Sequence, residues 1–96
     1  IAYNGVAVLS LPIDQFGKIR EEPQLTTHGL VEQDEESDLL ENILIQIEDE
    51  LNLMSDSEVV NDLKVKEMAR IIVRRYFKDT QKKRPLTSVH LIRIDD

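Results

Sequence analysis

The stretch Gly5-Val-Ala-Val-Leu-Ser-Leu-Pro-Ile13 contains the main signal for the fold. Its β-branched and apolar residues, followed by a turn signal at residues 14–17, predict a strand that ends in a tight turn. Side chains alternate between the two faces of a strand, so Val6 and Val8 share one face and the remaining apolar residues share the other. Apolar residues on both faces are typical of a strand in a sheet that is covered on both sides.

Two further strands are predicted around this one. Residues 18–26 alternate loosely and contain Pro23, which suits the edge strand of a hairpin. We expect a kink at residues 27–29, followed by a short extended piece. Thr87–Ile94 is the predicted last strand. One of its faces carries Val89 and Leu91, and the other carries Ile92 and Ile94.

Two helices are predicted between these strands. Apolar residues recur at three- and four-residue spacing over residues 39–51, after possible caps at residues 34–37, and again over residues 60–77. Ser55 and Glu58 match a capping box, and Asn61 is a second possible cap. Pro85 ends the second helix and its connection, because the residue before a proline disfavours helical geometry.

These elements predict a small α/β domain of the α+β kind, in the order strand, strand, helix, helix, strand, with residues 1–96 forming one domain. Two helices can cover one face of a three-stranded sheet, so we expect a second copy or a neighbouring domain to cover the other face. The candidate interface residues are Val6, Val8, Ile92 and Ile94. The alternative is an open face, because small sheets tolerate exposed aliphatic side chains.

Composition excludes several classes of protein. The 96 residues are 41% hydrophobic and 32% charged, as in an ordinary globular domain. The chain has no cysteine, which excludes disulfides, thiolate zinc sites and cysteine nucleophiles and fits a reducing, cytoplasmic environment. No apolar run approaches the length of a membrane span, so no membrane partner is expected. Because the chain opens on Ile rather than Met, we expect it to be a piece of a larger protein.

No motif for catalysis or metal binding is present. His28 and His90 are the two histidines, and neither has a companion at ligand spacing. Three glycines cannot build the usual nucleotide cradles. The acidic residues at 32–38 lack the pattern of a calcium loop and suit the start of a helix instead. We expect neither an active site nor a bound cofactor in this chain.

The charge is segregated along the chain despite a net charge of −7. Fourteen Asp or Glu and no Lys or Arg lie between Glu21 and Asp62, whereas nine Lys or Arg lie between Lys64 and Arg84. Spacing of four residues places part of the basic set along one face of the second helix, and the others follow its C-terminal end. The candidate RNA-contacting residues are Lys66, Arg70, Arg74, Lys78, Lys82, Lys83 and Arg84.

Two interpretations of this basic segment stay open. Cations near a helix C-terminus are favoured by the helix dipole, and the acidic residues Asp38, Glu41, Glu48 and Asp49 could pair with them across the two helices. A row of cations could instead contact the phosphate backbone of RNA. Tyr76 and Phe77 are expected in the core, so such binding would be non-specific.

Three stretches together resemble the C-terminal domain of ribonuclease J. They are Gly5–Asp14, Thr27–Val31, and Leu63–Leu86 with its Lys-Lys-Arg-Pro run, and they cover nearly the whole chain in the family's order. Two positions depart from the family pattern, because His28 stands where an arginine is common and Leu30 stands where an aromatic residue is common.

The resemblance implies a parent enzyme with a zinc-dependent metallo-β-lactamase domain and an inserted β-CASP domain. Such an enzyme cleaves RNA from the 5′ end and internally in bacterial RNA decay and maturation. The family's zinc-binding H-x-H-x-D-H motif is absent here, so zinc is expected only in the parent's catalytic domains. By the resemblance this domain would have no catalytic role and would help assembly, with its own catalytic domains and a second subunit as partners.

Overall fold

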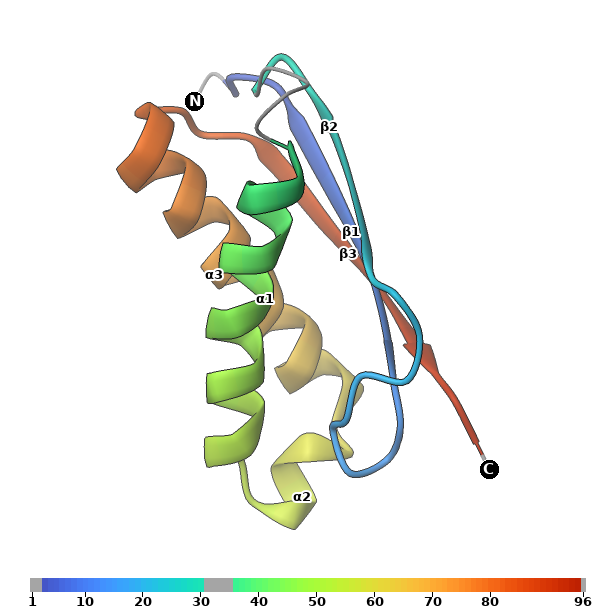
Figure 1. Cartoon of the computed structure of the whole chain (residues 1–96). Coiled ribbons are helices and arrows are strands. Elements are labelled where there is room, and N and C mark those ends of the chain that lie inside the picture. The colour runs from blue at the N-terminus through green and yellow to red at the C-terminus, as the bar shows by residue number, and fades with distance from the viewer. Residues whose placement is uncertain (1–2, 31–35, 96) are drawn as a thin grey trace.

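The computed structural model describes residues 3–30 and 36–95 of the chain. The elements are β1 (Val6–Ile13), β2 (Gln24–His28), α1 (Glu36–Leu53), α2 (Asp56–Val59), α3 (Asp62–Gln81) and β3 (Leu86–Arg93). The sheet order is β2-β1-β3, with β1 antiparallel to β2 and parallel to β3. Both long helices pack on one side of this sheet (Figure 1), so the predicted fold class is confirmed.

The number of helices differs from the prediction because each predicted cap begins its own helix. Ser55 Oγ accepts the N–H of Glu58 at 3.2 Å and the Glu58 carboxylate accepts the N–H of Ser55 at 3.1 Å, which completes the capping box of the short α2. Asn61 then caps α3, accepting the N–H of Lys64 at 3.2 Å. Two caps six residues apart therefore divide the connection into a single helical turn and a long helix.

The second strand also lies later in the chain than predicted. Pro23 has no N–H to donate to a sheet, and β2 begins only after it, at Gln24. Thr27 and His28, expected in a kink, instead pair with Ala7 and Val6 of β1. The predicted kink is thus wrong at these two residues, and the chain bends at Gly29, whose φ of 75° suits glycine. The short extended piece expected at residues 30–31 lies partly outside the described residues.

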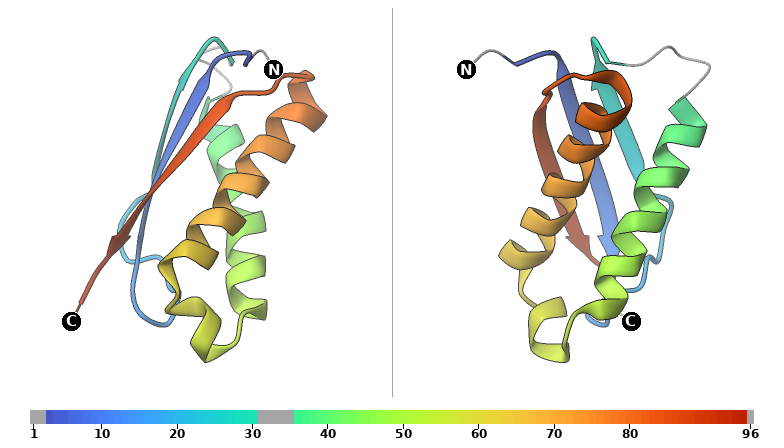
Figure 2. Two further views of the ribbon diagram at one scale, coloured as in Figure 1. Left: turned by 180° about the vertical axis from the view of Figure 1, so that it is seen from behind. Right: turned by 90° about the vertical axis from the view of Figure 1, so that its left-hand side faces the viewer.

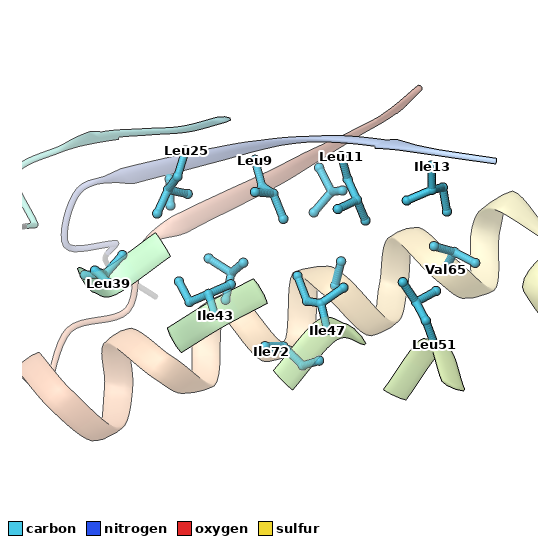
Figure 3. Packing of buried hydrophobic residues seen from close by; sticks show 14 of the residues in the cluster. Leu9, Leu11, Ile13, Leu25, Leu39, Ile43, Ile47, Leu51, Val65 and Ile72 are labelled. Carbon is cyan, nitrogen blue, oxygen red and sulfur yellow. The ribbon is translucent and has the colours of Figure 1, made fainter. Parts of the chain in front are cut away.

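The core lies between the inner face of β1 and the two long helices. Leu9, Leu11 and Ile13 are fully buried and point toward Ile43 and Ile47 of α1 (Figure 3). From α3 the fully buried Val65, Val73 and Phe77 complete this layer. Each such side chain contributes about 1.5–3 kcal/mol by leaving water, so this layer is the main source of stability.

The end of α3 agrees with the helix stop predicted before Pro85. Lys82 adopts a left-handed conformation with φ 56°, and its N–H and that of Lys83 donate to carbonyls of the last helical turn. Pro85 follows, and the N–H of Leu86 then donates to the carbonyl of Gly5 at 2.9 Å. The helix end therefore leads directly into the parallel pairing with β1.

Asp14 organises the turn after β1. Its Oδ1 accepts the N–H groups of Phe16 at 2.8 Å and Lys18 at 3.0 Å, and the Arg20 guanidinium lies 3.4 Å from its Oδ2. Gly17 allows the turn to close, because its φ is 84° and an added Cβ would lie 2.5 Å from the Val59 side chain. These contacts, led by the hydrogen bond from Lys18, lower the pKa of the Asp14 carboxyl.

Arg93 joins three segments at the end of the sheet opposite Gly5. Its guanidinium donates to the carbonyl of Asp14 at 2.9 Å, the carbonyl of Val59 at 2.7 Å, and the carboxylate of Asp62 at 2.9 Å. The end of β1, the end of α2 and the start of α3 are thus held by one side chain. Sequence patterns gave no signal for this role, because the three partners lie 31 to 79 residues away.

We predict that Arg93→Ala lowers the free energy of unfolding by about 1–3 kcal/mol, because two partly buried carbonyls lose their donor. Urea denaturation followed by circular dichroism measures the change. Lys66→Ala is the control, since Lys66 is exposed on α3 and a surface change of this kind costs within about 0.5 kcal/mol. Equal effects of the two substitutions would contradict the role given to Arg93.

We also predict a pH-dependent stability contribution from Asp14. A carboxyl with a lowered pKa in the folded state stabilises the fold above its unfolded pKa of about 3.9, and loses that contribution as the pH falls through the folded value. The gap in unfolding free energy between the native chain and Asp14→Asn should therefore be largest near neutral pH and narrow on acidification below about pH 4. A gap that stayed constant or widened would refute this assignment.

Candidate interaction surfaces

One face of the sheet carries no helix. α1 and α3 both lie on the opposite side, with α3 nearer β3 and α1 nearer β2 (Figure 2). The strand register places even-numbered residues on the open side, which we call the outer face. These residues are Val6, Val8, Ser10, Pro12, Gln24, Thr26, His28, Leu86, Ser88, His90 and Ile92.

Three of the four predicted interface residues, Val6, Val8 and Ile92, lie on this outer face, where they form two groups. Val6 and Val8 lie in the central strand, and Val6 is flanked by His28 and Leu86. Ile92 pairs with Pro12 at the other end, and Ile94 continues the ladder through its N–H, which donates to the carbonyl of Ile13 at 2.9 Å.

Leu86 is an outer-face residue that the sequence analysis missed. It is 51% exposed, as Ile92 is at 49%. The predicted strand started one residue too late, at Thr87, whereas Leu86 already pairs with Val6. The alternation with Ser88, His90 and Ile92 was the signal that could have found it.

β3 also offers an unpaired edge. The N–H groups of Leu86 and Ile94 point to β1, so the backbone groups of the odd-numbered residues of β3 point away from the sheet. In the described part of the chain β3 pairs only with β1. An edge of this kind can pair with a strand of another chain.

The predicted basic stripe on α3 is interrupted. Lys66, Arg74 and Lys78 are exposed, but Arg70 is half-buried and its Nε donates to Glu67 at 2.9 Å. This hydrogen bond lowers the pKa of the Glu67 carboxyl and raises the pKa of Arg70. The pairs considered possible with Asp38, Glu41, Glu48 and Asp49 are absent among the described residues, whose ion pairs lie elsewhere.

The three consecutive cations Lys82-Lys83-Arg84 have three different roles. Lys82 is the C-cap residue of α3, and its Nζ lies 3.4 Å from the carbonyl oxygen of Asp79. Lys83 Nζ donates to the carbonyl of Gly29 at 2.9 Å and so ties the helix end to the end of β2. Arg84 lines a surface hollow.

This hollow, which we call the basic hollow, has a volume of about 350 Å³. It is lined by Tyr3, Ile71, Arg74, Arg75, Lys78 and Arg84. Tyr3 is 55% exposed and Ile71 is 44% exposed, so the hollow combines an aromatic ring and an aliphatic side chain with four cations. Tyr3 was not a candidate in the sequence analysis, because nothing in the sequence indicates that it meets α3.

A second hollow has the opposite charge. It lies against α1, has a volume of about 420 Å³, and includes the carboxylates of Glu22, Glu41 and Glu48. The predicted charge segregation is therefore also spatial, with an acidic surface at α1 and a basic surface at α3.

The aromatic residues of α3 are placed largely as expected. Phe77 is fully buried. Tyr76 is half-buried against the core, and its hydroxyl accepts a hydrogen bond from Asn42 Nδ2 at 3.3 Å. Neither residue is therefore placed like Tyr3, which lines the basic hollow.

The histidines do not form a common site. His28 and His90 both lie on the outer face, but they pair with Val6 and Ser10 at different levels of the sheet. Over residues 3–30 and 36–95, no three His, Cys, Asp or Glu side chains are grouped to hold a metal ion. The acidic residues at 32–35 lie outside the described part. No described helix has the length and hydropathy needed to cross a membrane.

Comparison with known proteins supplies the family. No individual curated protein showed significant similarity to the chain. The family model described as the ribonuclease J C-terminal domain matches residues 1–94. This match confirms the resemblance found in the three sequence stretches, and the chain belongs to the ribonuclease J C-terminal domain family.

Proposed function

We propose that this domain has an assembly role, joining two copies of a ribonuclease J-like enzyme through the outer face of the sheet. The observation that carries the proposal is the open sheet face opposite α1 and α3, on which Leu86 and Ile92 are about half exposed. The free energy falls when a second surface covers apolar side chains that are exposed on a sheet face, because their apolar area leaves water.

The size of the outer face limits how tightly it can bind. The eight-residue strands β1 and β3 and the five-residue β2, at about 3.3 Å per residue and about 4.8 Å per strand, give a projected area of roughly 300 Å². A standard interface buries about 800 Å² on each partner. Association through this face alone should therefore be weak, and contacts from the β3 edge or from catalytic domains would add to it.

The composition of the face suits a reversible contact. Between the two apolar groups lie Ser10, Ser88 and His90, which can form hydrogen bonds across an interface. An obligate interface would be more uniformly apolar. We therefore expect the domain to fold as a monomer and to dimerise with rising concentration.

The parent enzyme would supply the chemistry. Its catalytic domains would hold zinc and cleave RNA in the bacterial cytoplasm, and this domain would position them by holding two subunits together.

We predict that the chain forms a reversible dimer and that Ile92→Asp weakens it by at least about tenfold, because the dimer would bury an unpaired charge. Sedimentation equilibrium over a wide concentration range gives the dissociation constants. Ile45→Asp is the matched control, since Ile45 is 53% exposed but belongs to α1 on the helix side. Circular dichroism checks that both variants fold.

Two outcomes would count against the assembly role. A chain that stays monomeric at all concentrations would leave the outer face to another partner. Equal weakening by Ile45→Asp and Ile92→Asp would place the contact elsewhere or reduce it to non-specific association.

A further inference from the structure

The basic hollow is a defined site, and its position is fixed by the backbone. The N–H of Asn4 donates to the carbonyl of Arg84 at 2.9 Å, and the N–H of Arg84 donates to Asn4 Oδ1 at 3.3 Å. These two hydrogen bonds hold the segment that carries Tyr3 beside the residue that follows α3. The aromatic ring and the cations therefore lie together although more than 65 residues separate them in the chain.

The four cations around the hollow form no salt bridge within the described part of the chain, although Arg74 lies close enough to Glu67 to help lower the pKa of that carboxyl. Arg70 on the same helix, by contrast, is paired with Glu67. Four cations gathered around one hollow repel each other and raise the local concentration of anions. An anionic ligand would relieve that repulsion.

We propose that the basic hollow binds one unpaired nucleotide of single-stranded RNA, with the base against Tyr3 and Ile71 and the neighbouring phosphates on the four cations. Unstacked bases bind aromatic side chains, and cations that follow the backbone supply the rest of the affinity. The volume of about 350 Å³ lies at the lower end of the range of about 300–1,000 Å³ for small-ligand sites.

RNA fits this site better than an acidic peptide does. A carboxylate-rich segment would use the cations but would leave the exposed Tyr3 ring and Ile71 without an apolar partner. A nucleotide provides both a flat apolar face and a phosphate. Membership of a ribonuclease family makes RNA available to the domain.

The site differs from the uniform basic stripe suggested by the sequence. Lys66 lies eight residues before Arg74, which is about 12 Å along the helix axis. Arg70 is occupied by Glu67, and Lys83 is bound to the Gly29 carbonyl. We therefore assign binding to one end of α3 instead of its whole length. The hollow is built on α3 and not on the outer face, so this proposal is independent of the assembly role.

Fluorescence anisotropy with a labelled short oligoadenylate RNA tests the aromatic part of the site. We expect a dissociation constant of roughly 1–100 µM at physiological salt. Tyr3→Ala should weaken binding by about 5- to 150-fold, the range measured for loss of one stacked base. Tyr3→Phe keeps the ring and should restore most of the affinity.

Matched charge reversals test the electrostatic part. Arg74→Glu should weaken binding by about tenfold or more, because a charged contact with phosphate is lost. Lys66→Glu makes the same charge change on the same helix, but Lys66 does not line the hollow and lies about 12 Å along the helix axis from Arg74, so it should have a clearly smaller effect. Loss of one phosphate contact should also reduce the slope of log affinity against log salt by about 0.7.

Nuclear magnetic resonance of ¹³C-labelled tyrosine reports stacking directly. The chain has two tyrosines, so Tyr76→Phe assigns both ring signals. Addition of the RNA should shift the Tyr3 ring signals upfield and leave those of Tyr76, which is outside the hollow, nearly unchanged.

Three results would overturn the proposal. Equal losses from Lys66→Glu and Arg74→Glu, with no effect of Tyr3→Ala, would show diffuse attraction without a site. Equal binding of duplex RNA would exclude an unpaired base. Equal binding of a polyglutamate peptide, again unaffected by Tyr3→Ala, would assign the cations to an acidic protein partner.

Discussion

The structure depends on the parallel pairing of β1 with β3. Eight residue pairs, from Val6 with Leu86 to Ile13 with Arg93, join the two ends of the chain. Parallel strands require a long crossover, because β3 must start at the same end of the sheet as β1. β2 returns the chain to that end, α1 leaves it, and α3 comes back to it (Figure 1). The helices thus lie together on one side, and the outer face stays open as a direct result.

The same pairing places the residues of the proposed nucleotide site. At the start of β1 it brings Asn4 to Arg84, so that Tyr3 joins the cations of α3. At the far end it brings Arg93 to the carbonyl of Asp14. One ladder therefore positions the basic hollow at one end of the sheet and the structural arginine at the other.

Local chemistry explains which parts of the fold could be predicted. The alternation in residues 5–13 separated the two sides of β1, and Ser55 and Asn61 were recognised as caps, although both were assigned to one helix, because these signals depend on neighbouring residues. The predicted bounds of β2 were wrong, because a loose alternation does not fix the ends of a strand. Pairing with β1 and the missing N–H of Pro23 fix them instead.

The roles of Arg93 and Tyr3 depend on contacts between segments that are distant in the sequence, and no rule of residue spacing predicts such contacts. The basic stripe was identified as a set of residues, but its division between Glu67, the Gly29 carbonyl and the hollow required the structure.

The two proposed surfaces would reinforce each other. Each would be weak alone, since the outer face is small and the hollow would take one nucleotide. Two copies joined through the outer face would present two hollows to one RNA strand, and the second contact would then form within the complex at a high effective concentration. Linkage requires the effect to be reciprocal, so an RNA long enough to reach both hollows would also favour the dimer.

The acidic surface at α1 would repel the RNA strand from the other side of each domain and direct it toward α3. The proposed site would let a domain with a net charge of −7 bind RNA at one place, because the local field around the hollow, and not the total charge, would decide where a phosphate binds.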